Sequence, residues 1–288
     1  MALPSLRSLV PIRRFREPTP VVGVLRLSGV IGQAGALRKG LTLEALAGPI
    51  ERLFKIKRLK AVALAVNSPG GSPVQSALIA RRIRSLAEEK DVPVIAFAED
   101  VAASGGYWLA CAADEIYADE SSIVGSIGVV SGGFGFTELI KRIGVERRLH
   151  TSGGRKGMLD PFSRERPEDV EHLHGIQGDV HESFKAMVRE RRAGKLKGDE
   201  EDLFSGAFWT GRRALDLGLV DGLGDLRSVM RGRYGEKVRF RLVGAEKGWL
   251  RRRLGGSFGG TPPGAAGDLV SGVLAAVEER LIWNRFGL

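Results

Sequence analysis

A serine and a lysine are the two residues of this sequence best suited to covalent catalysis. Ser104 lies in the segment AASGGY at 102–107, between an apolar strand-like run and a helix-like stretch. A hydroxyl at such a corner is close to the positive end of a helix and to glycine N–H groups. This setting suits a nucleophile whose reaction generates an oxyanion. Taken alone, Ser104 also fits a helix N-cap.

The proton of a serine nucleophile has to go to a base, and Lys156 is the best candidate. It lies in the segment SGGRKGMLDPF at 152–162, whereas the four histidines lie in contexts that do not suit a catalytic triad. A lysine can act as a base only when its amine is neutral, which requires an apolar, water-poor surrounding without a neighbouring carboxylate. We therefore expect Asp160 to point away from Lys156. Taken alone, Lys156 is also compatible with a loop cation.

Three further motifs occur in a fixed order around these two residues. NSPGG at 67–71 follows a strand-like run and supplies a glycine turn with free backbone donors. VGSIGV at 124–129 contains a second serine, and TGRRA at 210–214 leads to GLVD at 218–221. Together with the serine and lysine segments, this series resembles the signal peptide peptidase A family of serine peptidases over roughly residues 21–243.

The resemblance implies a role for each matched residue. Ser104 corresponds to the nucleophile, Lys156 to the general base, and Ser126 to the serine that hydrogen-bonds the lysine amine. The N–H groups of Gly71 and Gly105 correspond to the oxyanion hole. The implied activity is endopeptidase cleavage of hydrophobic peptides, such as signal-peptide remnants, after small or apolar residues, without a cofactor or metal. The implied fold is α/β, a crotonase/ClpP-like spiral of ββα units that assembles into homo-oligomeric rings, in which neighbouring subunits can share the serine and lysine.

The pattern of the chain itself alternates strand-like and helix-like segments, as an α/β fold requires. Strands are predicted at 21–31, 61–66, 92–98, 115–118, 123–130, 145–150 and 237–243, and helices at 43–54, 74–89, 136–143 and 167–193. We divide the chain into a basic N-terminal arm at 1–20, a catalytic domain at 21–247, a Gly/Pro-rich linker at 248–267, and an amphipathic C-terminal helix at 268–288. The last helix is expected to dock on its own or a neighbouring subunit.

Composition indicates an enzyme of ordinary size. The chain has 288 residues, of which 43% are hydrophobic, and its single cysteine, Cys111, excludes an internal disulfide. No run is long enough for a membrane-spanning helix and no secretory signal is evident, so a cytoplasmic location is expected. The net charge of +10 includes arginine clusters near both ends. They favour a solvated surface, with peripheral contact to an anionic membrane surface as the second interpretation, and nucleic acid is disfavoured because no aromatic residues interleave the arginines.

Other kinds of site and activity are less consistent with the sequence. His172 and His174 are two residues apart and would not share a face of the predicted helix, which argues against a metal site. The glycine-rich segment at 132–135 lacks the lysine and spacing of a nucleotide loop. Two alternatives to a peptidase stay open: an acyl-CoA hydratase or isomerase on the same fold, which would use carboxylates as acid and base, and a non-catalytic oligomeric scaffold.

The identity of the base can be tested by charge-conserving substitution. Lys156→Arg should be as inactive in peptide hydrolysis as Lys156→Ala, because a guanidinium keeps its proton at any accessible pH. The measurement is the rate of peptide cleavage by both variants and the unsubstituted protein between about pH 5 and pH 10. An active arginine variant would contradict the assignment.

Overall fold

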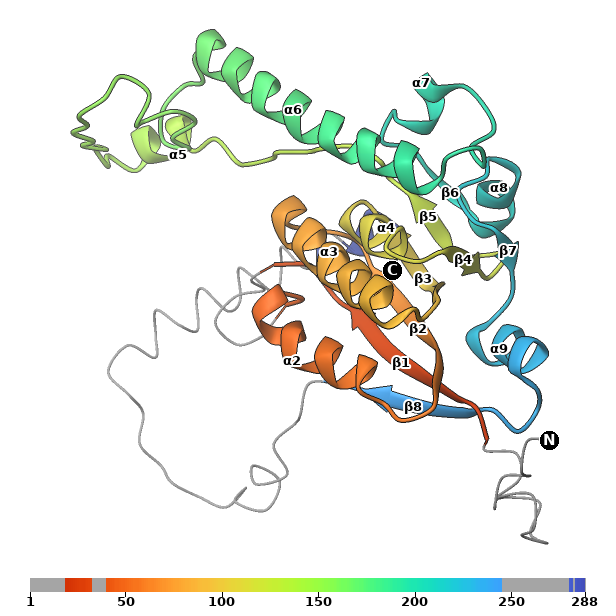
Figure 1. The fold of residues 1–288 in the computed structure, drawn as a ribbon. Helices are drawn as coiled ribbons and strands as arrows, with labels where there is room; N and C mark the ends of the chain where they lie inside the picture. The colour runs from red at the N-terminus through yellow and green to blue at the C-terminus, as the bar shows by residue number, and fades with distance from the viewer. Residues whose placement is uncertain (1–18, 33–39, 245–279, 282, 288) are drawn as a thin grey trace, which may run out of the picture.

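A computed structural model of the protein describes residues 19–32, 40–244, 280–281 and 283–287 (Figure 1). Its centre is an eight-stranded mixed sheet with the order β6-β5-β3-β2-β1-β8, from which β4 and β7 branch beside β3. Among the described residues, all strand pairings are parallel except that of β5 with β6, which is antiparallel. The strands are β1 (Val21–Ser28), β2 (Leu59–Ser68), β3 (Val94–Ala103), β4 (Glu115–Ala118), β5 (Ile123–Gly125), β6 (Phe208–Thr210), β7 (Gly222–Leu223) and β8 (Arg239–Val243).

Helices cover the sheet unequally on its two sides. Alternate side chains of β2 point to opposite faces, so Val62 and Leu64 join the large core under α2 and α3, whereas Ala61 and Ala63 join a smaller cluster with Met230 of α9. This two-sided burial explains the continuous apolar run of β2. The helices are α2 (Leu43–Phe54), α3 (Pro73–Lys90), α4 (Gly105–Ala110), α5 (Thr137–Arg142), α6 (Pro167–Arg191), α7 (Glu200–Leu203), α8 (Gly211–Asp216) and α9 (Leu226–Tyr234).

Strand β3 bends and so divides the sheet into two branches. Its first half, up to Ala98, pairs with β4, and its last residues, from Val101, pair with β5. The pairing with β2 changes register at the same place, between Val66 and Ser68. The side chain of Asn67 fills this irregularity, donating to the Asp100 carboxylate at 2.6 Å and accepting from Val101 N–H at 3.2 Å. The bend therefore sets the direction in which the end of β3 leaves the sheet.

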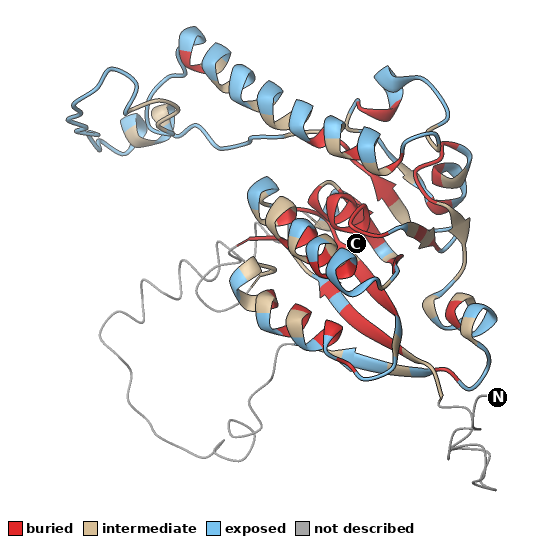
Figure 2. Ribbon diagram, viewed as in Figure 1, coloured by how far each residue is buried: buried red, intermediate tan, exposed pale blue. Residues whose placement is uncertain are grey.

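A long arm leaves the sheet after β5. Residues 129–166, which include α5, project away from the sheet in Figure 1, and the chain returns along α6. Figure 2 shows that most of the arm is exposed, and α5 has no buried residue. Six of its large apolar side chains are at least 45% exposed: Val130, Phe134, Leu139, Ile143, Val145 and Leu149. The arm thus presents an apolar surface that the described residues of its own chain do not cover.

The structure confirms the predicted α/β class and most of the predicted elements. The predicted helix at 43–54 coincides with α2, and the predicted strand at 115–118 coincides with β4. The strand predicted at 145–150 is wrong: these residues are exposed in the arm and pair with no strand in the described ranges. A short alternating pattern does not suffice for a strand without a neighbour to pair with. The strand predicted at 123–130 ends at Gly125, where the arm begins to leave the sheet.

The last residues of the chain dock on the strand end of β3. Phe286 is 9% exposed, clusters with Val101 and Ala103, and meets Phe208 edge to face with ring centroids 5.1 Å apart. Residues 280–281 and 283–284 are helical, residues 285–287 form a turn, and the contact is with the same chain. The N-terminal arm up to residue 18, the linker, and the predicted C-terminal helix up to residue 279 lie outside the described residues. Among the described helices, none is long and apolar enough to span a membrane.

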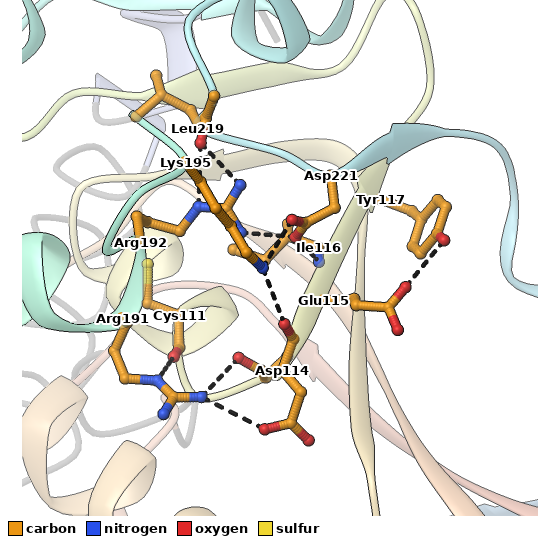
Figure 3. A network of polar contacts seen from close by, with 12 residues as sticks. Cys111, Asp114, Glu115, Ile116, Tyr117, Arg191, Arg192, Lys195, Leu219 and Asp221 are labelled. Atoms are coloured by element: carbon orange, nitrogen blue, oxygen red, sulfur yellow. Dashed lines mark hydrogen bonds and ion pairs between the residues drawn. The ribbon is translucent and has the colours of Figure 1, made fainter. Parts of the chain in front are cut away.

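A buried ion-pair network fastens the end of α6 to the branch formed by β4 and β7 (Figure 3). Arg192 is 2% exposed, donates two hydrogen bonds to Gly218 O, and contacts the Asp221 carboxylate at 2.5 Å. The same carboxylate accepts from Lys195 Nζ and from Ile116 N–H, both at 2.8 Å. Burial by itself would raise the pKa of Asp221, but the hydrogen bonds from these three donors hold the pKa below its usual value.

The same region also holds the end of α4. Arg191 donates to the carbonyl oxygen of Cys111, the C-cap residue of α4, and to Ala113 O in the segment that follows the helix. Tyr107, in the middle of α4, donates its hydroxyl to Leu219 O at 2.8 Å. The loop before β7 and the end of α6 therefore fix the C-terminal end of α4. Ser104 lies at the other end of this helix, directly before its first residue.

The network predicts a pH-dependent stability. Because the pKa of Asp221 is lowered on folding, its stabilisation is complete above the unfolded pKa of about 3.9 and is lost as pH falls through the lower folded pKa. Asp221→Asn should lower the free energy of unfolding at pH 7 by about 3 kcal/mol, because Arg192 stays buried without its counter-ion. It should also flatten the acid side of the stability profile. Urea unfolding at a series of pH values measures both effects.

An exposed ion pair supplies the control. Glu120 contacts Arg212, and both side chains are about 60% exposed. Glu120→Gln should change the free energy of unfolding by less than about 1 kcal/mol. An equal loss of stability in both variants would show that Asp221 has no special structural role.

Candidate active site

Ser104 lies at a sharp turn between β3 and α4. Its backbone has φ 52° and ψ −123°, a conformation that costs a non-glycine residue roughly 1–3 kcal/mol. The turn is held on both sides, because Ser104 N–H donates to Gly125 O at 2.8 Å and Ser104 O accepts from Trp108 N–H at 3.0 Å. The side chain makes no capping hydrogen bond to α4, so the N-cap interpretation does not explain the serine. The strained turn instead leaves the hydroxyl available for chemistry.

The glycine turn after β2 passes directly against this serine. A β-carbon at Gly70 would lie 2.8 Å from Ser104 Cβ and 2.9 Å from Gly105 N, and Gly70 has φ 109°. A β-carbon at Gly71, where φ is 138°, would overlap with Ile31 O. Any larger residue would push the turn away from Ser104. The two glycines are therefore required by close approach as well as by backbone conformation.

Two backbone donors converge beside the serine. Ile31 donates to Gly70 O and accepts from Ser72 N–H, both at 2.8 Å, so the N–H of the intervening Gly71 is directed away from Ile31. Gly105 is the first residue of α4, where an N–H has no partner within the helix. A β-carbon at Gly105 would lie 3.4 Å from Gly71 N, which places the two backbones in direct contact. This arrangement can hold a negatively charged oxygen.

Two buried serines support these backbones, and neither was recognised from the sequence. Ser76 donates to Ser72 O at 2.9 Å, and its Oγ lies 2.5 Å from the position of a Gly105 β-carbon. Ser68 accepts from Gly70 N–H at 3.2 Å, and its carbonyl oxygen would overlap with a β-carbon at Gly106. The position of Ser76, one helical turn after the capping Ser72, is the only sequence signal for this contact.

Ser126 comes to the same place from β5. It is 3% exposed, follows the Gly125 whose carbonyl accepts from Ser104 N–H, and has φ 53°. Its own N–H donates to Ala207 O at 2.6 Å. The structure therefore brings four of the five predicted site residues together, namely Ser104, Ser126, Gly71 and Gly105.

Lys156 is not with them. It lies in an exposed turn of the arm, where its N–H donates to Gly153 O at 3.1 Å. In the described residues its amine makes no hydrogen bond or ion pair with Ser104 or Ser126. As expected, the carboxylate of Asp160 faces another partner, Arg147, at 3.5 Å. A single chain thus holds the serine and the lysine on separate parts, the sheet and the arm.

The single cysteine does not compete with Ser104 as a nucleophile. Cys111 is buried at the end of α4, and burial raises the pKa of its thiol to about 12, although the nearby Arg192 opposes the shift. Burial also raises the pKa of Tyr107 well above its usual value. Both groups stay neutral at ordinary pH, and Cys111 packs as a small buried side chain.

The fold and the site together define a class of protein: an α/β protein with a strained serine beside two converging backbone donors. A family model described as peptidase family S49 matches residues 87–234, more than half of the chain. The chain belongs to peptidase family S49. This confirms the predicted resemblance to the signal peptide peptidase A family.

Three relatives illustrate the range of similar proteins. The chain is 33% identical over 207 residues to "Serine protease SPPA, chloroplastic" of Arabidopsis thaliana, covering 70% of this chain and 29% of that protein. It is 32% identical over 207 residues to "Putative protease slr0021" of Synechocystis, covering 69% and 73%. It is 54% identical over 293 residues to "Na(+)/H(+) antiporter NhaA" of Brucella abortus, covering 100% of this chain and 40% of that protein. The chain therefore spans less than half of the Brucella relative.

The close approach between α4 and the end of β2 can be tested at Gly106. Alanine usually stabilises a helix interior relative to glycine by about 1 kcal/mol, but a β-carbon here would overlap with Ser68 O. We expect Gly106→Ala to lower the free energy of unfolding by about 1–3 kcal/mol and to impair reaction of Ser104 with an active-site label. Chemical unfolding and labelling kinetics measure the two effects.

Gly175 provides the matched control. It lies within α6, where nothing would contact an added β-carbon within 4 Å. Gly175→Ala should stabilise the protein by up to about 1 kcal/mol and leave labelling unchanged. If both alanine variants were more stable than the parent protein, the close approach at Gly106 would be refuted.

Proposed function

We propose that the chain is a serine endopeptidase in which Ser104 is the nucleophile and Lys156 the general base. The observation that carries this proposal is the strained turn at Ser104, whose hydroxyl does not cap α4 and which lies beside the backbones of Gly71 and Gly105. A strained backbone costs free energy of folding and is found mostly at functional sites, so the conformation of Ser104 supports a catalytic role. Membership of peptidase family S49 supports the same reaction class.

In the proposed reaction, Lys156 acts first as a base and then as an acid. Neutral Lys156 removes the Ser104 proton as Oγ attacks the carbonyl carbon of the scissile peptide bond, and the Gly71 and Gly105 N–H groups bind the resulting oxyanion. When the C–N bond breaks, the lysine ammonium gives the proton to the leaving amine. Water, deprotonated by the neutral Lys156 amine, then attacks the ester carbonyl, and the lysine ammonium returns the proton to Ser104 Oγ as the acid product leaves. Ser126 orients the lysine without adding a carboxylate that would keep the amine protonated.

The lysine reaches the serine in an assembly of several copies. The arm exposes six large apolar side chains, which is unusual for a surface that stays in water and typical of a surface that meets another protein. We propose that arms pack against neighbouring copies in a homo-oligomeric ring, so that Lys156 of one copy serves Ser104 of another. The predicted C-terminal helix is proposed to strengthen this assembly.

The proposed substrates are hydrophobic peptides such as signal-peptide remnants, cleaved after small or apolar residues. A cavity of about 630 Å³ lies beside the glycine turn, lined by Leu43 and Ala47 together with polar residues that include Ser72 and Gln75. Because its wall includes Ser72, the residue after the proposed oxyanion donor Gly71, it offers space for substrate side chains. A cytoplasmic location is proposed, with the arginine-rich ends as contacts for an anionic membrane surface.

A non-catalytic oligomeric scaffold is the second candidate, because Lys156 and Ser104 are apart within one chain. The deciding experiment uses a fluorophosphonate label, which forms a covalent bond with activated serines, together with a peptide-hydrolysis assay. The unsubstituted protein should be labelled at Ser104 by mass mapping and should cleave peptides. Ser104→Ala and Lys156→Ala should each lose activity by several orders of magnitude while keeping the fold.

Mixing the two inactive variants tests the shared site. If the pair is formed between copies, some contacts in a mixed assembly regain both residues, and part of the hydrolysis should return. Either variant incubated alone is the control. Absence of both labelling and hydrolysis in an oligomer of the unsubstituted protein would favour the scaffold, whereas activity without complementation would reject only the sharing between copies.

A further inference from the structure

One face of α6 contacts the parts of the chain that carry the proposed site. His181, Phe184 and Val188 are spaced by three and four residues, so they lie on the same side of the helix. Phe184 is 3% exposed and stacks on Trp108 of α4 with ring centroids 4.7 Å apart, and Val188 is fully buried. His181 is the member of this face nearest to the arm, and the mechanism proposed above gives it no role.

Within the described part of the chain, His181 makes one hydrogen bond, to the backbone of the residue after Ser126. Its Nε2 lies 3.1 Å from Ile127 O. A carbonyl oxygen can only accept, so Nε2 must carry the hydrogen and donate it. Ile127 is fully buried, and its carbonyl would lose its donor if the imidazole were removed. The histidine is therefore a specific partner of the residue that follows Ser126.

The position of this bond in the fold gives it a wider effect. Ile127 lies where the chain leaves β5 toward the arm, and α6 is the helix along which the chain returns from the arm. The bond thus joins the outgoing and returning segments near the base of the arm (Figure 1). The other contacts of this segment come from the sheet side, through Gly125 O to Ser104 N–H and through Ser126 N–H to Ala207 O.

We propose that His181 is a positioning residue that, by donating Nε2–H to Ile127 O, fixes both Ser126 and the base of the arm that carries Lys156. The proposal rests on the function proposed above. Without this bond, the segment at 126–128 can shift relative to Ser104, and the lysine is presented in a less productive geometry. A displacement of about 1 Å in such a site can lower a rate on the order of 100-fold.

Steady-state peptide hydrolysis separates positioning from a merely structural role. For His181→Ala we expect kcat to fall about 10-fold to 100-fold while KM changes by less than about 2-fold, because substrate binding is untouched. His181→Gln, whose amide nitrogen can donate in place of Nε2, should recover most of kcat. His174→Ala is the matched control, since His174 is exposed on the same helix. Thermal unfolding of each variant establishes that the fold is retained.

A second measurement does not depend on activity. The chain has four histidines, so side-chain ¹H–¹⁵N spectra can be assigned with single variants. We expect the His181 signal to show the hydrogen on Nε2, and a ring protonated only on Nδ1 at neutral pH would overturn the proposal. If His181→Ala kept the parental kcat, the role of His181 would be refuted while the peptidase function stands. If the parent protein showed no Ser104-dependent hydrolysis, the proposed function itself would fall.

Discussion

The site depends on a contact between two backbones that only glycine permits. The turn after β2 and the start of α4 approach so closely that β-carbons at Gly70, Gly71 and Gly106 would meet Ser104, Ile31 O and Ser68 O, respectively. This contact forces Ser104 into its positive-φ turn and brings two N–H groups to one point. The helices, the bend in β3 and the ion-pair network all act on this contact by holding the two backbones where they meet.

The bend in β3 and the network at the far end of α4 hold the contact from opposite directions. Asn67 stabilises the bend just before the glycine turn, so the same motif that supplies the backbone donors also orients the strand that carries Ser104. At the other end of α4, Tyr107 and the carbonyls of Cys111 and Ala113 are tied to the loop before β7 and to α6. A short helix of six residues has little stability by itself, and these contacts fix its direction.

Helix α6 links this rigid part of the molecule to the exposed arm. Its last residues join the buried network around Asp221, its middle packs on Trp108 and Ile127, and its first residues continue from the arm. The arm carries few buried side chains and exposes many apolar ones. Such a surface suits an element that completes a site in a neighbouring copy, and α6 attaches it firmly to the sheet and α4 of its own chain.

The sequence by itself determined the alternation of strands and helices, the helix boundaries around α2 and α3, and the serine corner with its glycines, because these follow from local periodicity and turn chemistry. It also identified Ser126, although only through the resemblance. Tertiary structure decided the rest. The segment at 145–150 has the pattern of a strand but no neighbour to pair with, and the contacts of Asn67, Ser76 and His181 join residues that local pattern does not connect. The separation of Lys156 from Ser104 within one chain is equally tertiary, since it depends on where the arm projects and not on any local preference.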